Sequence, residues 1–177
     1  MIKRIFTTTI IIMLSIFLTG CNTEKETNKK ANCKIFDCIN KIEPEDTVDE
    51  INEIFGFKGE LIDKKYKIYE WQLNDDENIQ VAYYSSDKSQ IKLKYNRSDL
   101  KNKKVDFSNY ENFKDDLKKG VKITYNDLVK SFKTKGTLVA KSSISKKYTW
   151  VSKNGSYLTA TISNSNDRCT VLIGKVK

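Results

Sequence analysis

The residue types that carry most enzyme chemistry are sparse in this chain. Its 177 residues include no histidine, and this excludes Ser-His-Asp and Cys-His nucleophile systems as well as histidine-based zinc sites. None of its seven glycines lies in a phosphate-binding loop motif. The sequence therefore predicts that the protein is not an enzyme and needs no cofactor.

Three short patterns could still support chemistry. Segments 89–92 and 143–146 match S-x-x-K, a nucleophile motif that works at a helix start together with further motifs. Both segments have a turn-and-strand pattern here, and such matches arise by chance in a lysine-rich chain. The acids at 75–77 could hold a calcium ion but lack the spaced ligands of a calcium loop. We interpret them as a solvated turn and expect no metal.

The first residues have the pattern of a secretion signal. Lys3 and Arg4 precede the apolar segment 5–17, which is too short to span a membrane, and LTGC follows at 18–21. This stretch resembles the lipobox of bacterial lipoproteins, which implies that Cys21 is lipidated and becomes the mature N-terminus. Two acyl chains would anchor the protein stably in the lipid bilayer, on the extracytoplasmic face of the cell membrane. The alternative is an ordinary signal peptide with a chance cysteine.

Three further cysteines leave the disulfide state open. Cys33 and Cys38 lie close together in the sequence, in a location that permits disulfides. In a helix, their spacing would put the Cα atoms about 8–9 Å apart, beyond disulfide reach. Either this turn is irregular, or Cys169 is one partner, or all three thiols are free. A redox role for Cys33 or Cys38 is a further alternative.

The net charge of +9, or +7 without Lys3 and Arg4, has two interpretations. A basic protein beside anionic lipid or wall polymer gains roughly 1 kcal/mol per favourably placed lysine. Alternatively, the lysines only solvate the surface, since acids are interspersed and no run of like charge has the length of a binding tail. No pattern predicts a nucleic-acid partner.

Two fifteen-residue windows, at 47–61 and 124–138, are alike. The identical pairs are Thr47/Thr124, Phe55/Phe132, Lys58/Lys135, Gly59/Gly136 and Leu61/Leu138. YEW at 69–71 and YTW at 148–150 follow and contain both tryptophans of the chain. These matches indicate an internal repeat.

Each window predicts a capped helix. Thr47 with Glu50 forms a capping box, and Thr124 with Asp127 forms a weaker one. Apolar residues then recur at helical spacing. Shorter helices are expected before them, at about 32–41 and 109–118. Gly56 can take the left-handed position after the first helix.

The second window has Lys133 at the position of Gly56, so we expect the second helix to end differently. After each helix the apolar period changes to two, which predicts strands. The expected strands cover 59–64, 69–73, 79–83, 91–95, 136–142, 148–150, 158–162 and 169–173. On the last of these, Cys169, Val171 and Ile173 are expected to face the core.

The sequence thus predicts an α+β fold of two tandem modules, each a helix–turn–helix packed on a four-stranded antiparallel sheet. The expected organisation is a signal peptide at 1–20, a polar tether at 21–31, modules at 32–98 and 109–177, and a linker at 99–108.

The motif series T-x-x-[ED]-[IL], K-G-x-L and Y-x-W, followed by alternating strands, resembles the small module of the BamE (SmpA/OmlA) lipoproteins. In tandem it is similar to β-lactamase inhibitory protein and covers about 32–175. This resemblance implies two modules whose joined sheets form a concave protein-binding surface. The second unit lacks the cysteine pair expected in each module.

Tyrosines among polar groups on a rigid sheet suit protein recognition. The residues expected on the solvent face of the sheet, and hence to bind a partner, are Gln72, Gln80, Tyr84, Lys92, Lys94, Val151, Tyr157, Thr159, Thr161 and Leu172. We therefore predict a non-enzymatic lipoprotein that binds an envelope protein, as an inhibitor or a scaffold. The alternative is a basic surface lipoprotein that associates with wall polymers or anionic lipid.

Overall fold

The computed structural model describes residues 31–85 and 88–177. The predicted signal peptide, and Cys21 with its predicted lipidation, lie outside these residues. The helices are α2 (Ile35–Lys41), α3 (Val48–Phe55), α4 (Tyr110–Lys118) and α5 (Tyr125–Ser131), with a 3₁₀ turn η1 (Arg97–Leu100). The strands are β1 (Glu60–Asp63), β2 (Ile68–Asn74), β3 (Glu77–Ser85), β4 (Lys88–Lys94), β5 (Lys101–Asn102), β6 (Thr137–Ser142), β7 (Ser145–Ser152), β8 (Tyr157–Ser163) and β9 (Cys169–Lys175). In the described ranges, every helix is too short or too polar to cross a bilayer.

Both predicted capping boxes are present. The hydroxyl oxygen of Thr47 accepts the Glu50 N–H, and the Glu50 carboxylate accepts the Thr47 N–H. Thr124 and Asp127 make the same exchange at α5. The bonds from the backbone and hydroxyl of Thr47 lower the pKa of Glu50, and those from the hydroxyl and backbone of Thr124 lower the pKa of Asp127. The carboxylates therefore stay ionised at the positive ends of the two helices.

The end of α5 agrees with our expectation in part. Gly56 is the C-cap of α3 in the left-handed conformation, with φ of 79°, as the sequence predicts. α5 ends differently, one residue earlier in the repeat, with Phe132 as its C-cap at φ of −82°. Lys133, the counterpart of Gly56, nevertheless has a positive φ of 60°, despite the contact that this conformation makes between its Cβ and the backbone.

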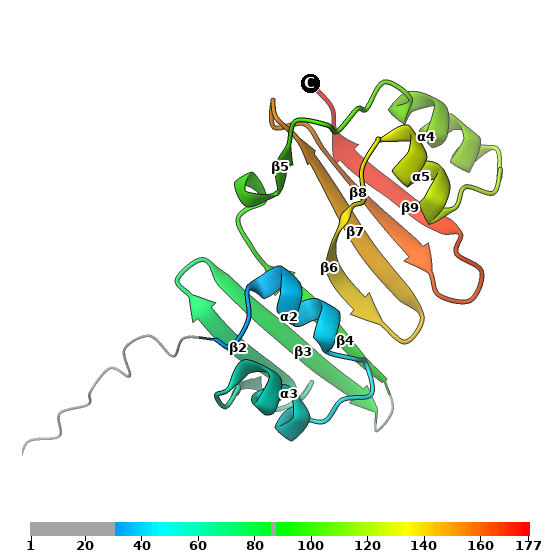
Figure 1. Cartoon of the computed structure of the whole chain (residues 1–177). Helices are drawn as coiled ribbons and strands as arrows, with labels where there is room; N and C mark the ends of the chain where they lie inside the picture. The colour runs from blue at the N-terminus through cyan, green and yellow to red at the C-terminus, as the bar shows by residue number, and fades with distance from the viewer. Residues whose placement is uncertain (1–30, 86–87) are drawn as a thin grey trace, which may run out of the picture.

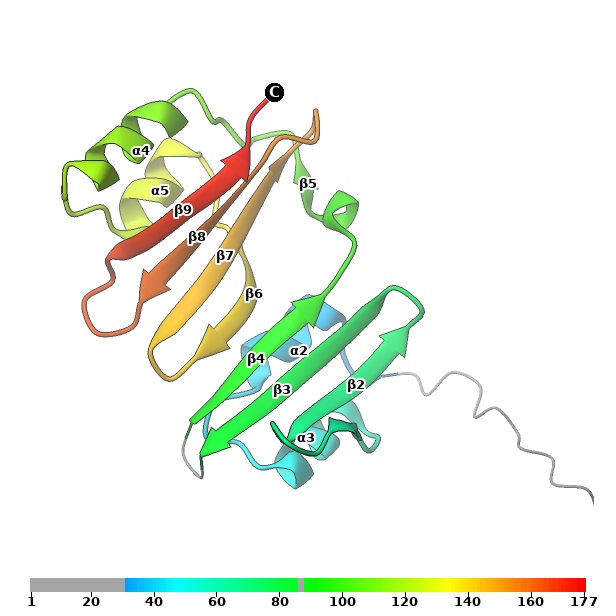
Figure 2. The same ribbon diagram turned by 180° about the vertical axis from the view of Figure 1, so that it is seen from behind.

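The predicted fold class is wrong: the molecule is not two tandem modules that each pack helices on their own four-stranded sheet, but, over the described residues, four helices on one mostly antiparallel sheet. β4 pairs antiparallel with β6, and this pairing joins the strands of both halves into one nine-stranded sheet. The order along the sheet is β1-β2-β3-β4-β6-β7-β8-β9 (Figures 1 and 2). Two separate sheets would have left both β4 and β6 with an unpaired edge, which the joined sheet avoids.

The expected linker at 99–108 contains a strand that the sequence did not reveal. β5 pairs in parallel with the end of β7, opposite Val151 and Ser152, just beyond the point where the β6–β7 pairing ends. Two residues without an alternating apolar pattern give no strand signal. The pairing of β5 with β7 therefore depends on the tertiary structure, and it holds the segment between the two halves against the sheet.

All four helices lie on one side of the sheet (Figures 1 and 2). The strand register agrees, because Ile91, Lys141, Lys146 and Ile162 are consecutive cross-strand neighbours on the helix side. α2 and α3 cover a cluster around Trp71, and α4 and α5 cover a second cluster around Trp150. Tyr148 packs against both clusters. We call the opposite side of the sheet the open face.

The structure decides between the three alternatives for the disulfide state. Cys33 and Cys38 form a disulfide with Cα atoms 5.6 Å apart. This is possible because α2 begins only at Ile35, so Cys33 precedes the helix and the turn is irregular. Cys169 is free and buried, and burial raises the pKa of its thiol to about 11. It is therefore a protonated, unreactive thiol at neutral pH.

Candidate binding face

One row of cross-strand neighbours runs across the whole open face. From β1 to β9, its members are Glu60, Glu70, Gln80, Lys92, Ala140, Lys147, Thr161 and Val171. The row begins with acids, passes through lysines at the junction of β4 with β6 and β7, and ends with an apolar side chain. Because adjacent members lie about 5 Å apart, this row is a continuous surface that no single half of the chain contains.

Charge is segregated between the strands. β1, β2 and β3 carry Glu60, Asp63, Glu70 and Glu77 and have no lysine or arginine. β4 to β9 have no acid but carry three lysines on β4, two on β7 and one each on β5, β6 and β9. The acids that intersperse the sequence therefore lie mostly in turns and helices, and the strands themselves form an acidic edge and a basic body.

All five predicted partner-binding residues of β2 to β4 lie on the open face. Gln72, Tyr84, Lys92 and Lys94 are exposed, and Gln80 is half-buried. The Gln80 amide donates to the Glu70 carboxylate at 2.7 Å. The Tyr84 hydroxyl donates to the Gln90 side chain at 3.1 Å. The structure thus brings the two lysines together and leaves their ammonium groups available.

On β7 and β8 the predicted residues are partly covered. Thr159 and Thr161 are half-buried on the open face. Val151 points to this face but is only 2% exposed, because η1 and β5 lie against its strand. The guanidinium carbon of Arg97 sits 3.7 Å from the centre of the Tyr157 ring. Val151 is therefore too buried to contact a partner. The ring of Tyr157 is covered by the Arg97 side chain on one side.

Leu172 does not lie on the open face, contrary to the prediction. A β-bulge places Thr161 opposite Val171 but Ile162 opposite Cys169. One extra residue in a strand inverts the side of every residue after it. Leu172 accordingly packs on the second core cluster, while Val171 and Ile173, which we expected in the core, are exposed.

The sequence also missed Lys147, which is exposed beside Ala140 on the open face. Alternation from Trp150 would have found it, since residues 147 and 150 must face opposite sides. Its neighbours Gln90, Ala140, Ser145 and Thr161 line a polar hollow of about 230 Å³ at the junction of β4 and β6.

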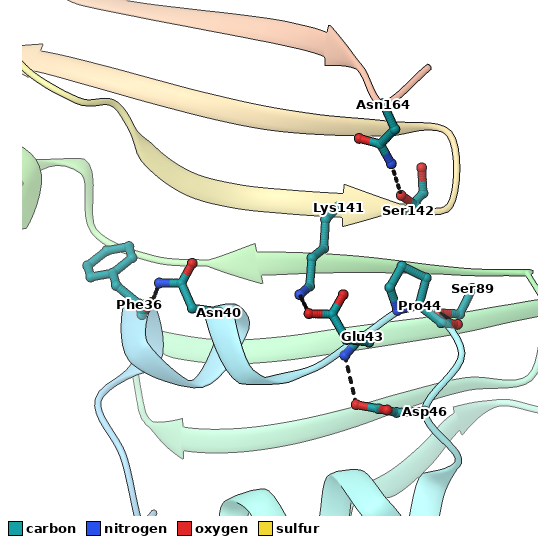
Figure 3. Close-up of polar contacts among 9 residues, drawn as sticks. All are labelled: Phe36, Asn40, Glu43, Pro44, Asp46, Ser89, Lys141, Ser142 and Asn164. Atoms are coloured by element: carbon teal, nitrogen blue, oxygen red, sulfur yellow. Dashed lines mark hydrogen bonds and ion pairs between the residues drawn. The ribbon is translucent and has the colours of Figure 1, made fainter. Parts of the chain in front are cut away.

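The helix side of this junction is closed by an ion pair. Lys141 on β6 extends toward the turn after α2, where its Nζ lies 3.2 Å from Glu43 Oε1 (Figure 3). The Lys141 side chain is 3% exposed and that of Glu43 is 60% exposed. Nearby, the Ser89 hydroxyl donates to the Pro44 carbonyl at 2.7 Å (Figure 3). The turn of the first half is thus attached to strands from both halves.

The geometry separates the two residues of the S-x-x-K match at 89–92. Ser89 is buried on the helix side, whereas Lys92 is exposed on the open face, so the two cannot act on one substrate. Among the described residues, no three acidic or cysteine side chains gather as a metal site would require.

No family model, curated protein or solved structure matches this chain.

Proposed function

We propose that this chain is a non-enzymatic lipoprotein, anchored on the extracytoplasmic face of the cell membrane through lipidated Cys21, that binds an acidic envelope protein through the open face. The observation that carries the proposal is the lysine group of Lys92, Lys94 and Lys147 on a face whose strands β4 to β9 contain no acid. The cross-strand neighbours of these lysines include the polar side chains of Asn78, Gln80 and Thr161, which provide hydrogen bonds on the same face. A protein surface with carboxylates is the complementary partner.

Site-specific photocrosslinking in living cells tests this proposal with the full chain. A crosslinking amino acid at Thr161 on the open face should give a discrete protein adduct. The same group at Lys119, which is exposed after α4 on the helix side, should not. Adducts at both positions, or none at Thr161, would contradict a specific face.

Two charge-matched variants then test the lysines. The triple variant Lys92→Gln, Lys94→Gln, Lys147→Gln should lose the Thr161 adduct. The triple variant Lys64→Gln, Lys65→Gln, Lys119→Gln changes the net charge equally at exposed positions elsewhere and should keep it. Equal loss in both variants would indicate a general attraction to anionic wall polymer or lipid, because such attraction depends on total charge and ionic strength.

A further inference from the structure

One end of the second half contains a basic hollow, where the segment 103–108, the β7–β8 hairpin and the C-terminus lie together (Figure 1). The hollow has a volume of about 510 Å³. Lysines from three separate segments line it, namely Lys103, Lys104, Lys133 and Lys177. None of them belongs to the lysine group of the open face, so the hollow is a second, separate basic region.

Positive charge exceeds negative charge in the hollow. The side chains that line it include one carboxylate, that of Asp106, and Lys133 Nζ lies 2.8 Å from its Oδ2. Lys103, Lys104 and Lys177 form no ion pair with another described residue. The excess stays positive even when a carboxylate at the end of Lys177 is counted. An anion that enters the hollow therefore meets lysines that no acid neutralises.

A buried hydroxyl also lines the hollow. Ser156 is 1% exposed, and its Oγ accepts the backbone N–H of Lys177 at 2.9 Å. Among the described residues, the hydrogen of this hydroxyl has no acceptor. Buried polar groups are normally hydrogen-bonded, and a serine hydroxyl donates as well as accepts. An oxygen of a ligand in the hollow would supply the missing acceptor.

The corresponding place in the first half has a different charge. Counted from the two tryptophans, 74–77 (Asn-Asp-Asp-Glu) corresponds to 153–156 (Lys-Asn-Gly-Ser). Lys133 stands where the first half has Gly56, with a positive φ that favours glycine. The repeated fold therefore requires neither this lysine nor the serine. A lysine kept in a strained backbone conformation is typical of a functional position.

We propose that this hollow binds the terminal phosphate of a phosphate monoester, carried by a soluble molecule or by a lipid head group. Such a phosphate has close to two negative charges and three acceptor oxygens, so it can contact lysines from different segments and the Ser156 hydroxyl together. A carboxylate offers one charge and two oxygens. Lysine binds phosphate as a point charge, which suits the exposed side chains of Lys103 and Lys104. This inference is independent of the proposed function, since no open-face lysine takes part in it.

An amide-resolved NMR titration of the full chain in mild detergent tests the site, with glycerol 3-phosphate as the probe at constant ionic strength. We expect a Kd of about 1 mM or tighter, with the largest shifts at the amides around Lys133 and Ser156. Sodium chloride at the same ionic strength should leave these amides unchanged. No shift up to about 20 mM glycerol 3-phosphate, or the same shifts with chloride, would overturn the proposal.

Two matched pairs of variants test the lysines. Lys103→Gln with Lys104→Gln should raise the Kd at least about tenfold, because two nearby charges are lost. Lys64→Gln with Lys65→Gln removes an adjacent exposed pair in the first half and should change the Kd less than about twofold. Equal weakening by both pairs would contradict a local site.

Two single variants should change the Kd in opposite directions. Asp106→Asn should lower it about threefold or more, because the competing carboxylate is lost and Lys133 is released. Ser156→Ala should raise it about tenfold, because a hydrogen bond to a charged group is lost. Urea midpoints establish that each variant is folded. A higher Kd in Asp106→Asn, or an unchanged Kd in folded Ser156→Ala, would contradict the proposal.

Phosphatidic acid added to the micelles, with phosphatidylcholine as the control, identifies the source of the phosphate. Movement of the same amides with phosphatidic acid assigns the site to a lipid head group. Movement with glycerol 3-phosphate alone assigns it to a soluble ester. Both results support a site for a terminal phosphate, whereas equal movement with phosphatidylcholine would contradict it.

Discussion

Trp71 and Trp150 occupy matching places in the two halves of the sheet, but their indole N–H groups are satisfied differently. Each ring lies directly against a glycine, Gly59 or Gly136. Trp71 Nε1 donates to the side-chain oxygen of Asn52 at 3.0 Å, whereas Trp150 Nε1 donates to the backbone carbonyl of Thr134 at 2.9 Å. Both tryptophans are buried.

The comparison shows which features of the tryptophan site both halves share and which differ between them. Both need a residue without Cβ beside the ring, because the indole fills that space. Both also need an acceptor for a buried N–H. Asn52 supplies the acceptor in the first half and additionally accepts the Gly59 N–H at 2.8 Å. The corresponding residue on α5 is Val129, which has no acceptor, and the backbone replaces it.

The largest expected effect comes from filling the shared contact. A Cβ at Gly59 would lie 2.5 Å from the Trp71 ring, and one at Gly136 would lie 2.7 Å from the Trp150 ring. Gly59→Ala and Gly136→Ala should each lower the free energy of unfolding by about 2–3 kcal/mol, since a buried ring must move. Urea denaturation of each variant measures the loss.

Gly120→Ala is an unsuitable control because its φ is 78°, so Ser143→Ala in the exposed hairpin serves instead. A cost below about 0.5 kcal/mol at either glycine would refute the shared requirement.

The next prediction concerns the half that relies on a side chain. Asn52→Ala should cost about 2 kcal/mol, because it leaves the Trp71 and Gly59 N–H groups without their acceptor. Val129→Ala at the corresponding position should cost about 1 kcal/mol, from lost apolar contacts alone. Double variants with Trp71→Phe measure the coupling. Asn52→Ala should cost less once the indole N–H is gone, and full additivity would mean that the bond contributes nothing.

The ion pair at the junction of the halves should respond asymmetrically. Glu43→Gln leaves the buried Lys141 ammonium without its carboxylate, and we expect a loss of about 1–2 kcal/mol. Lys141→Met removes the buried charge itself and should change stability by less than about 0.5 kcal/mol, because an apolar side chain of similar length replaces it. Urea midpoints check both, and equal losses would show that the pair itself stabilises the junction.

A smaller effect should distinguish the two left-handed positions. Lys133→Gly should relieve up to about 1 kcal/mol of backbone strain. The wild-type lysine also contacts Asp106, with Nζ and Oδ2 2.8 Å apart, and this contact offsets part of the gain. The comparison is therefore made in an Asp106→Asn background. No stabilisation there would mean that the left-handed lysine is unstrained.

The smallest prediction is the part of the pH dependence that Asp106, in the second half, contributes. Hydrogen bonds from Lys133 and from Ser108 lower the pKa of Asp106 from 3.8 to about 2. A lowered pKa stabilises the folded state above the ordinary value, and this stabilisation is lost as the pH falls from 3.8 toward 2. Asp106→Asn should flatten this part of the stability profile between pH 4 and 2. An unchanged slope would show that Asp106 does not contribute to it.

Local elements were predictable because local chemistry determines them. The two capping boxes, the helices that they begin, the eight longer strands and the left-handed Gly56 all follow from residues within one turn or one alternation. The open-face positions of Gln72, Gln80, Lys92 and Lys94 follow from the same alternation. The failures at Leu172 and Val171 have one cause: a bulge at the start of β9 that no residue in the sequence marks.

By itself, the sequence determined the order of helices and strands, the repeated positions of glycine and tryptophan, and the absence of histidine chemistry, since these depend on residue types and short spacing. Only the tertiary structure decided that β4 pairs with β6, that β5 joins β7, and that lysines from distant strands form one surface. Strand pairing between distant segments depends on which edges remain free after each half has folded, and on which side chains, such as Tyr148 and Lys141, can pack across the junction. No local pattern carries that information.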